Sequence, residues 1–152
     1  MFKKKIITLT FDLDWCTDEV LNHTLEKLIK DSVPATFFVT HHTKLLNVIR
    51  RHDFFELGIH PNFNNNSTHG ENYQDIISHC FSLVPEALSS RSHGLLISSN
   101  IRNCLLEAGI KIDCSIFMPN NIILNNFFFE MNSKKIYFVS FRFLRSLIRD
   151  SM

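Results

Sequence analysis

Apolar runs and segments of helical periodicity alternate along most of the chain. After three lysines, residues 6–11 form a nearly continuous β-branched and apolar run, which predicts a buried strand. Residues 17–30 carry apolar side chains at helical spacing, and Pro34 bars an extension of that helix. The same alternation predicts strands at residues 35–40, 55–60 and 110–115, and helices around residues 45–49, 72–83 and 99–108. A spacing of roughly 30 residues is typical of βα units, so the pattern predicts an α/β fold with a parallel sheet.

The length of 152 residues suits a single domain over residues 1–152, and neither a repeat nor a linker divides it. With 45% hydrophobic and 20% charged residues, the composition is that of a chain that forms a core. The net charge of +1 argues against nucleic acid as a partner, because neutralising phosphates requires an excess of Lys and Arg. Charge is uneven, however: the last 22 residues carry five basic side chains and one acidic one. Residues 127–152, rich in Phe, therefore form a distinct basic tail.

The N-terminal sequence does not have the pattern of a secretory signal. A basic start is followed by an apolar stretch that is interrupted at Thr8 and meets Asp12, which is too short for a signal peptide. No run reaches the roughly 18–20 apolar residues of a membrane span. The four cysteines lack the CxxC spacing, and we expect them to be reduced and mostly buried. These features predict a cytoplasmic protein.

Metal-binding side chains gather where the predicted strands end. Asp12 and Asp14 follow the first strand, His60 follows the third, and Arg91 and His93 lie in a later loop. Residues two apart on an extended chain point to the same side, so both aspartates should face the carboxyl edge of the sheet. One Asp with two His suits zinc or another first-row divalent ion. Each motif alone also has a plainer interpretation: Asp-x-Asp occurs in phosphatases, nucleases and turns, and either histidine can stabilise a loop.

Taken in order, these motifs resemble the polysaccharide deacetylase superfamily (carbohydrate esterase family 4, the chitooligosaccharide-deacetylase homology domain), and most of all its WbmS-like branch. The resemblance extends over residues 5 to about 118 and rests on four segments: TLTFDLDW (8–15), ATFFVT (35–40), ELGIHPNFN (56–64) and RSHG (91–94). It implies a distorted (β/α) barrel, and the short chain suggests a barrel that is incomplete at its C-terminus.

The resemblance implies specific roles for three of these residues. The first aspartate of the family's opening motif is the general base, which corresponds to Asp12, and the second is a metal ligand, which corresponds to Asp14. The arginine of the later motif orients the catalytic aspartate, so Arg91 should pair with Asp12. The implied reaction is metal-assisted amide hydrolysis, in which Asp12 accepts a proton from water.

The family's second motif, which supplies two histidine ligands, is only partly present. His60 matches the first histidine, but Asn64 stands in the place of the second, or Phe63 on a strict count. By resemblance to the WbmS-like branch, His93 should complete an Asp-His-His set. We expect zinc as the ion and a carbohydrate as the substrate.

Two further residues are candidates for substrate binding. Trp15 directly follows Asp14 and has two interpretations, stacking on a sugar ring or packing in the core. Asn64 is the second candidate. His41 and His42 follow a predicted strand and either line the mouth of the site or are simple loop residues. The remaining histidines are expected at the surface, and His69 in the Asn-rich loop is the one among them that deserves inspection.

Two functional hypotheses follow. The first is a metal-dependent hydrolase that removes acetyl groups from N-acetylated sugars of a bacterial surface polysaccharide. The second is an impaired remnant that binds metal or carbohydrate without turnover, because the family's late histidine, its general acid, is missing: no His follows His93. The tail 127–152 is accordingly interpreted as the product of truncation or frameshift, or as part of a divergent short form. The alternative interpretations are an amphipathic helix that packs on the barrel and a helix that lies on a membrane surface.

Overall fold

The computed structural model describes residues 9–116, 127–131 and 134–138. Seven strands form one sheet in the order β1-β2-β3-β4-β5-β7-β6. The strands are β1 (Leu9–Asp12), β2 (Ala35–Val39), β3 (Phe55–Ile59), β4 (Ser89–Ser90), β5 (Ile112–Asp113), β6 (Phe127–Met131) and β7 (Lys134–Phe138). The helices are α1 (Asp18–Lys30), α2 (Leu46–Ile49), α3 (Tyr73–Leu83) and α4 (Ser99–Glu107), with a short 3₁₀ turn, η1 (His93–Leu95).

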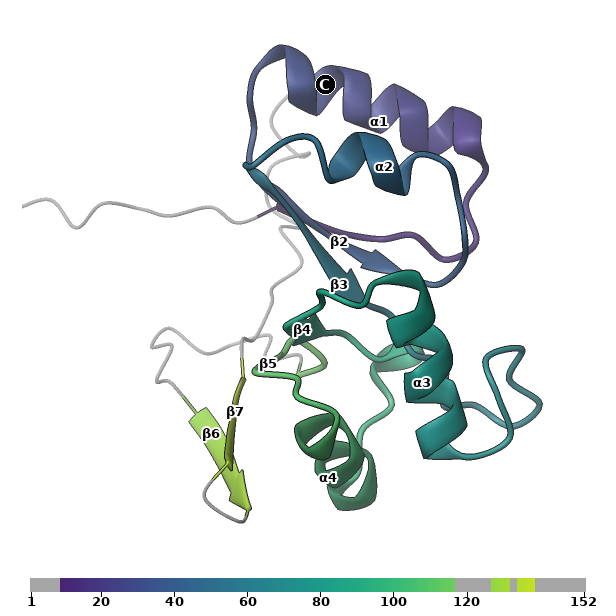
Figure 1. Ribbon diagram of the computed structural model, residues 1–152, viewed down its shortest axis with the longest axis vertical. Coiled ribbons are helices and arrows are strands. Elements are labelled where there is room, and N and C mark those ends of the chain that lie inside the picture. The colour runs from purple at the N-terminus through teal and green to yellow at the C-terminus, as the bar shows by residue number, and fades with distance from the viewer. Residues whose placement is uncertain (1–8, 117–126, 132–133, 139–152) are drawn as a thin grey trace, which may run out of the picture.

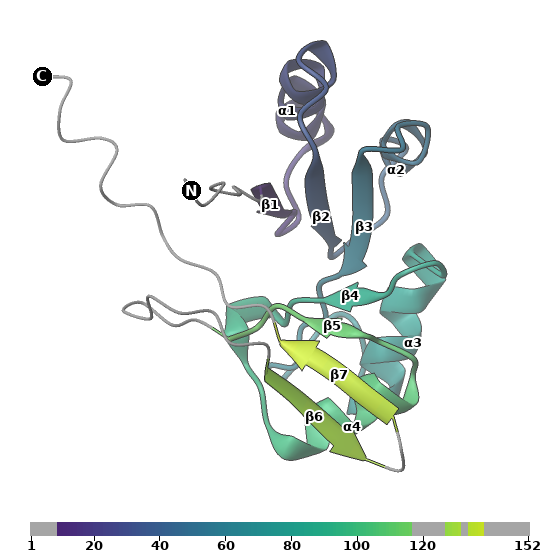
Figure 2. The same ribbon diagram turned by 90° about the vertical axis from the view of Figure 1, so that its left-hand side faces the viewer.

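The sheet is parallel except for one pair. Neighbouring strands from β1 to β5 run parallel, β7 continues this direction beside β5, and β6 runs antiparallel to β7. Strands β1 to β3 stand at a steep angle to β4, β5 and β7, so the sheet is strongly curled (Figure 2). The four helices of the described residues lie on one side of it (Figure 1). The chain therefore forms a curled, open half-barrel, which confirms the predicted α/β fold class.

The core explains why these segments take these conformations. The apolar stripe of α1 packs on the sheet, where most side chains of β2 and the C-terminal half of β3 are buried. The buried apolar side chains of these three elements are Leu21, Leu25, Leu28, Ala35, Phe37, Phe38, Val39, Leu57 and Ile59. The N-terminal ends of α3 and α4 are capped by Asn72 and Ser98, whose side chains accept hydrogen bonds from backbone N–H groups three residues later. Local sequence signals and tertiary packing agree in this part of the chain.

Strand β4 and the extent of β5 differ from expectation. Ser89 and Ser90 have no apolar pattern, yet both are buried and form β4 between β3 and β5. A strand was predicted over residues 110–115, and β5 occupies only Ile112 and Asp113 of that stretch. These short strands are stabilised by their neighbours in the sheet rather than by local propensity.

The alternative interpretation of the tail as a helix is wrong for the part that the structure describes. Residues 127–131 and 134–138 pair as the antiparallel strands β6 and β7, and β7 also pairs with β5. Ile136 is fully buried while Lys134 and Lys135 are exposed, so the inward side chain of β7 completes the core. The remaining tail positions, 139–152, lie outside the described residues, and so does their predicted helix. Among the described helices, none has the length and apolar character needed to cross a membrane.

Candidate metal centre

The carboxyl ends of β1, β3 and β4 bring the predicted site residues to one place. Asp12 is the last residue of β1, and Asp14 follows two positions later. His60 follows β3, where its backbone N–H donates to Val39 O at 2.9 Å. His93 begins η1 beyond β4, and its N–H donates to Pro61 O at 2.9 Å. Backbone hydrogen bonds to neighbouring segments thus fix where both histidines leave the sheet.

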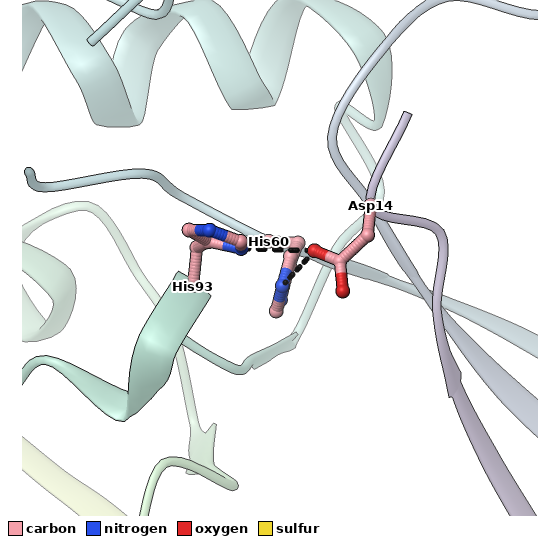
Figure 3. Close-up of side chains that lie close together, drawn as sticks. All are labelled: Asp14, His60 and His93. Atoms are coloured by element: carbon pink, nitrogen blue, oxygen red, sulfur yellow. Dashed lines mark hydrogen bonds and ion pairs between the residues drawn. The ribbon is translucent and has the colours of Figure 1, made fainter. Parts of the chain in front are cut away.

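Three side chains converge at this edge (Figure 3). Asp14 Oδ1 lies 3.2 Å from His60 Nε2 and 2.9 Å from His93 Nδ1. The three candidate ligand atoms all lie within 4.8 Å of one another, and this is the one such group of His, Cys, Asp and Glu side chains found in the described part of the chain. A donor set of one carboxylate oxygen and two imidazole nitrogens is typical of catalytic zinc sites.

The turn after β1 places Asp14. Leu13 still pairs with β2, since its N–H donates to Phe38 O at 3.0 Å, and its side chain is buried. Asp14 and Trp15 then adopt positive φ angles of 39° and 55°. The expectation that Asp12 and Asp14 share an extended segment is therefore wrong: a left-handed turn carries Asp14 to the histidines. Asp tolerates this region better than most residues, whereas a bulky Trp is strained there, and such strain is common at functional sites. The N–H of Trp15 donates to Thr40 Oγ1 at 3.1 Å, which holds the turn.

His60 has the environment that a metal ligand needs. Its side chain is only 2% exposed, and burial lowers its pKa, so the ring is neutral near pH 7. Nε2 faces Asp14, whereas Nδ1 is buried without a hydrogen-bond partner among the described residues and lies 4.0 Å from Asp12 Oδ1. Metal-bound histidines commonly direct their second nitrogen toward a carboxylate in this way. The residues present thus fit a divalent ion.

Arg91 contacts Asp12 behind the three converging side chains. Its Nη1 donates to Asp12 Oδ1 at 2.9 Å and to Thr10 Oγ1 at 3.0 Å, and the guanidinium carbon lies 4.5 Å from the centre of the Phe38 ring. Its Nε donates to Cys114 O at 3.2 Å. The expected Arg91–Asp12 contact is present, and the structure adds Thr10, Phe38 and the Cys114 carbonyl as supports that no local sequence signal indicated.

An exposed aromatic side chain, Trp15, lies beside the candidate ligand His93. Trp15 is 42% exposed, so its alternative interpretation as a core residue is wrong. Its indole meets His93 edge-on at 5.3 Å between ring centroids and lies 5.6 Å from His69. His69 is only 4% exposed, which contradicts the surface position expected for it, and it stacks on His79 at 4.9 Å. Burial, followed by the nearby His79, lowers the pKa of His69 to about 4.

Asn64 does not join the group. It is exposed in the polar loop, where its backbone N–H donates to Asn62 Oδ1 at 3.1 Å. No hydrogen bond within the described residues links its side chain to Asp14, His60 or His93. Phe63, the alternative on a strict count, is buried against Tyr73 and offers no ligand atom. His93 therefore supplies the third candidate ligand, and substrate binding by Asn64 stays a prediction.

Comparisons with known proteins were made by sequence and by fold. The family of WbmS-like polysaccharide deacetylases matches the chain over residues 9–146. A solved structure from Bordetella bronchiseptica, WbmS, described as a polysaccharide deacetylase involved in O-antigen biosynthesis, is similar with a TM-score of 0.80 and 38% identity. A structure described as a polysaccharide deacetylase from Mycobacterium smegmatis has a TM-score of 0.65 at 16% identity, which shows a shared fold.

The two structural matches cover most of this chain but only part of each relative. Each match covers 88% of this chain, but only 56% of the Bordetella protein and 57% of the mycobacterial one, so the chain spans little more than half the length of these relatives. Among curated proteins, no sequence matches. The family match over most of the chain, the 38% identity and the shared curled sheet agree with one another. The chain therefore belongs to the WbmS-like polysaccharide deacetylases.

Proposed function

We propose that the chain is a divalent-metal-dependent hydrolase that removes acetyl groups from N-acetylated sugars of a bacterial surface polysaccharide. The observation that carries this proposal is the convergence of Asp14 Oδ1, His60 Nε2 and His93 Nδ1 within 4.8 Å. The Arg91–Asp12 pair lies directly beside it. Family membership supports the reaction class, and the involvement of the Bordetella relative in O-antigen biosynthesis supports the substrate class.

Asp14, His60 and His93 would hold the ion. Their mixed nitrogen and oxygen set favours zinc, and three protein ligands leave a position open. When bound, a divalent ion supplies Lewis acidity, which makes water more acidic and polarises an amide carbonyl. The neutral state of His60, which its burial favours, keeps Nε2 available for coordination.

Asp12 is the proposed general base. Arg91 donates to Asp12 Oδ1, which orients the carboxylate and leaves its second oxygen to accept a proton from water. Arg91 is itself buried, and its Nε donates to the backbone carbonyl of Cys114. These contacts hold the guanidinium group, and with it the carboxylate of Asp12, in place. The pair thus acts as a base held in one orientation beside the ligands.

Trp15 is the proposed sugar platform. An indole that is 42% exposed beside the ligand His93 offers an apolar face on which a pyranose ring can stack. The neighbouring loop from Pro61 to Gly70 is rich in Asn, Ser and Thr, whose side chains suit hydroxyl groups. The exposed indole and this polar loop together support a carbohydrate as the substrate of the chain.

A deacetylation assay tests the proposal. Acetate release from N-acetylated chito-oligosaccharides should occur with zinc, fall on treatment with a chelator and return on addition of zinc. Asp12→Asn should lower the rate by ~10²–10⁴, the usual contribution of a positioned base. Asp31→Asn makes the same change at an exposed site at the end of α1 and should leave the rate unchanged. Equal rates for the two variants would refute the role of Asp12.

Binding without turnover is the second candidate function. The general acid of the family is a late histidine, and no His follows His93 in this sequence. His69, near the site, has a pKa lowered to about 4, so at neutral pH its ring is not a charged acid. Zinc binding by calorimetry together with no acetate release would favour this candidate, whereas turnover that Asp12→Asn abolishes would exclude it.

A further inference from the structure

The segment at the end of β5, residues 113–115, contacts Arg91 and Ser92, which lie next to the site residues. Asp113, Cys114 and Ser115 are all buried, although two of them are polar. The segment is attached to β4, because the N–H of Cys114 donates to Ser90 O at 2.7 Å. On its other side, β5 pairs with β7, where Asp113 lies opposite Phe138. Neighbouring strands therefore fix its position on both sides.

Ser115 connects this segment to the ligand His93. Its Oγ accepts the backbone N–H of Ser92 at 2.9 Å. Ser92 is fully buried and directly precedes His93, so this bond fixes the backbone from which the ligand side chain projects. Ser115 is oriented in turn by Asp113, whose Oδ1 accepts the Ser115 N–H at 2.9 Å. The path from Asp113 to His93 thus consists of two buried hydrogen bonds and one peptide link.

Cys114, which lies between Asp113 and Ser115, is linked to the proposed base Asp12 through Arg91. The carbonyl of Cys114 accepts a hydrogen bond from Arg91 Nε at 3.2 Å, and Arg91 Nη1 reaches Asp12 Oδ1 at 2.9 Å. Three consecutive residues, Asp113 at the end of β5 and the two that follow it, therefore support both the turn that carries His93 and the Arg91–Asp12 pair. The acceptor atoms of the two contacts, Cys114 O and Ser115 Oγ, belong to adjacent residues. A shift of this segment would therefore move both the Arg91–Asp12 pair and the backbone before His93.

A buried carboxyl group at this position is unfavourable for stability by itself. Asp113 is fully enclosed, its Oδ2 has no hydrogen-bond partner among the described residues, and burial raises its pKa. Unsatisfied buried polar atoms cost free energy, so they persist mainly where they serve a structural or functional purpose. The hydrogen bond from the Ser115 N–H to Asp113 Oδ1 indicates that Asp113 serves to hold Ser115 in place.

We propose that Asp113 and Ser115 are positioning residues that hold Ser92, and through it His93, in register with the Arg91–Asp12 pair. This inference rests on the proposed metal-dependent function and extends it to a residue pair outside the ligand group. Residues that orient metal ligands typically change metal affinity by ~10–100-fold when replaced. The effect of Ser115 should therefore appear in metal affinity and not only in stability.

Calorimetric titration of the full chain with zinc tests the proposal, with a matched control. Ser115→Ala should weaken zinc binding by ~10-fold or more. Ser89→Ala also removes one hydrogen bond from a buried serine, here the bond to Glu56 Oε1, which is not part of the path from Asp113 through Ser115 to Ser92. We expect a similar fall in unfolding temperature for both and unchanged zinc affinity for Ser89→Ala. Equal zinc affinities in the two variants would overturn the proposal.

Two variants of Asp113 separate positioning from folding. Asp113→Asn keeps an oxygen that can accept the Ser115 N–H, so its zinc affinity should stay within about threefold of the parent chain, well below the loss typical of a missing orienting residue. Asp113→Ala removes the acceptor and should resemble Ser115→Ala. If both Asp113 variants bind zinc like the parent chain, Asp113 has no positioning role.

A metal-free measurement keeps this inference distinct from the proposed function. Hydrogen exchange of the Ser92 amide in the metal-free chain should accelerate in Ser115→Ala and stay unchanged in Ser89→Ala. A parent chain that binds no zinc refutes the metal site, and the exchange result then still decides whether Ser115 holds the Ser92 backbone. Unchanged exchange in Ser115→Ala overturns the inference whether or not zinc binds.

Discussion

Replacing the two aspartates separately should affect zinc binding in different ways. Asp14 Oδ1 is the atom that both ligand histidines approach, at 3.2 and 2.9 Å. Asp12 instead accepts from Arg91 and lies 4.0 Å from His60 Nδ1, the nitrogen that faces away from the ligand group. Asp14→Ala therefore removes a charged ligand, whereas Asp12→Asn changes only a neighbour of one ligand.

The expected magnitudes follow from this difference. Loss of a residue that only orients a ligand costs ~10–100-fold in affinity, so loss of a ligand itself should exceed ~100-fold, or ~2.7 kcal/mol. In Asp12→Asn the amide oxygen can still accept the Arg91 hydrogen bond, and the distance to His60 is too long for a strong bond. We therefore expect a loss of less than ~10-fold for Asp12→Asn. Arg91→Ala, which removes the partner of Asp12 and no ligand, should resemble Asp12→Asn.

Isothermal titration of zinc into the three variants measures these affinities directly. Thermal unfolding of each metal-free variant serves as the control for folding. The side chain of Asp14 is 51% exposed, so Asp14→Ala should unfold within a few degrees of the parent chain. Equal weakening of zinc binding in all three variants would mean that the aspartates act as interchangeable charges, and the assignment of one ligand and one base would be wrong.

Two further predictions concern the surroundings of the metal site. Trp15→Ala should raise KM for N-acetylated oligosaccharides by about tenfold, as expected for the loss of ~1.4 kcal/mol of stacking, with kcat little changed; an unaltered KM would argue against stacking on sugar. His69 should contribute to acid sensitivity, because its pKa is about 4 in the folded chain and ~6.5 in the unfolded chain. Protonation then favours unfolding, so stability present above pH ~6.5 is lost as the pH falls toward 4, by up to ~3 kcal/mol. His69→Asn, whose oxygen can replace Nδ1 as acceptor for the Asn62 N–H, should reduce this loss in urea unfolding at pH 7.5 and pH 5, and an identical loss in both proteins would contradict the assignment.

The amino-acid sequence by itself determined the succession of most elements. Continuous apolar runs indicated β1, β2 and β3. The predicted burial is confirmed for most of β2 and β3, whereas β1 lies at one end of the described sheet and is only partly buried. Helical periodicity indicated α1, α3 and α4, and Pro34 barred an extension of the first helix, which ends at Lys30. The order of the chemistry-bearing residues at strand ends was also sufficient to indicate the family, since short motifs at loop starts need no knowledge of packing.

Only the tertiary structure decided which distant segments meet. Strand β4 consists of two serines and has no apolar pattern of its own, so only pairing with β3 and β5 makes it a strand. In the tail, β6 pairs with β7 and β7 with β5, although the sequence had left a helix open as one interpretation of that stretch. Both cases reflect the same physics, because the partners that satisfy a strand's backbone groups lie far away in sequence.

The site shows the same division between local and long-range information. The sequence placed Asp14, His60 and His93 at strand ends, but the left-handed turn at Asp14 and the burial of His69 depend on contacts with other strands and loops. The bonds that join Arg91 to Asp12 and to Cys114 span 79 and 23 residues. Hydrophobic periodicity reports which face of an element is buried, whereas such contacts depend on the register and curl of the whole sheet, and no local pattern encodes those.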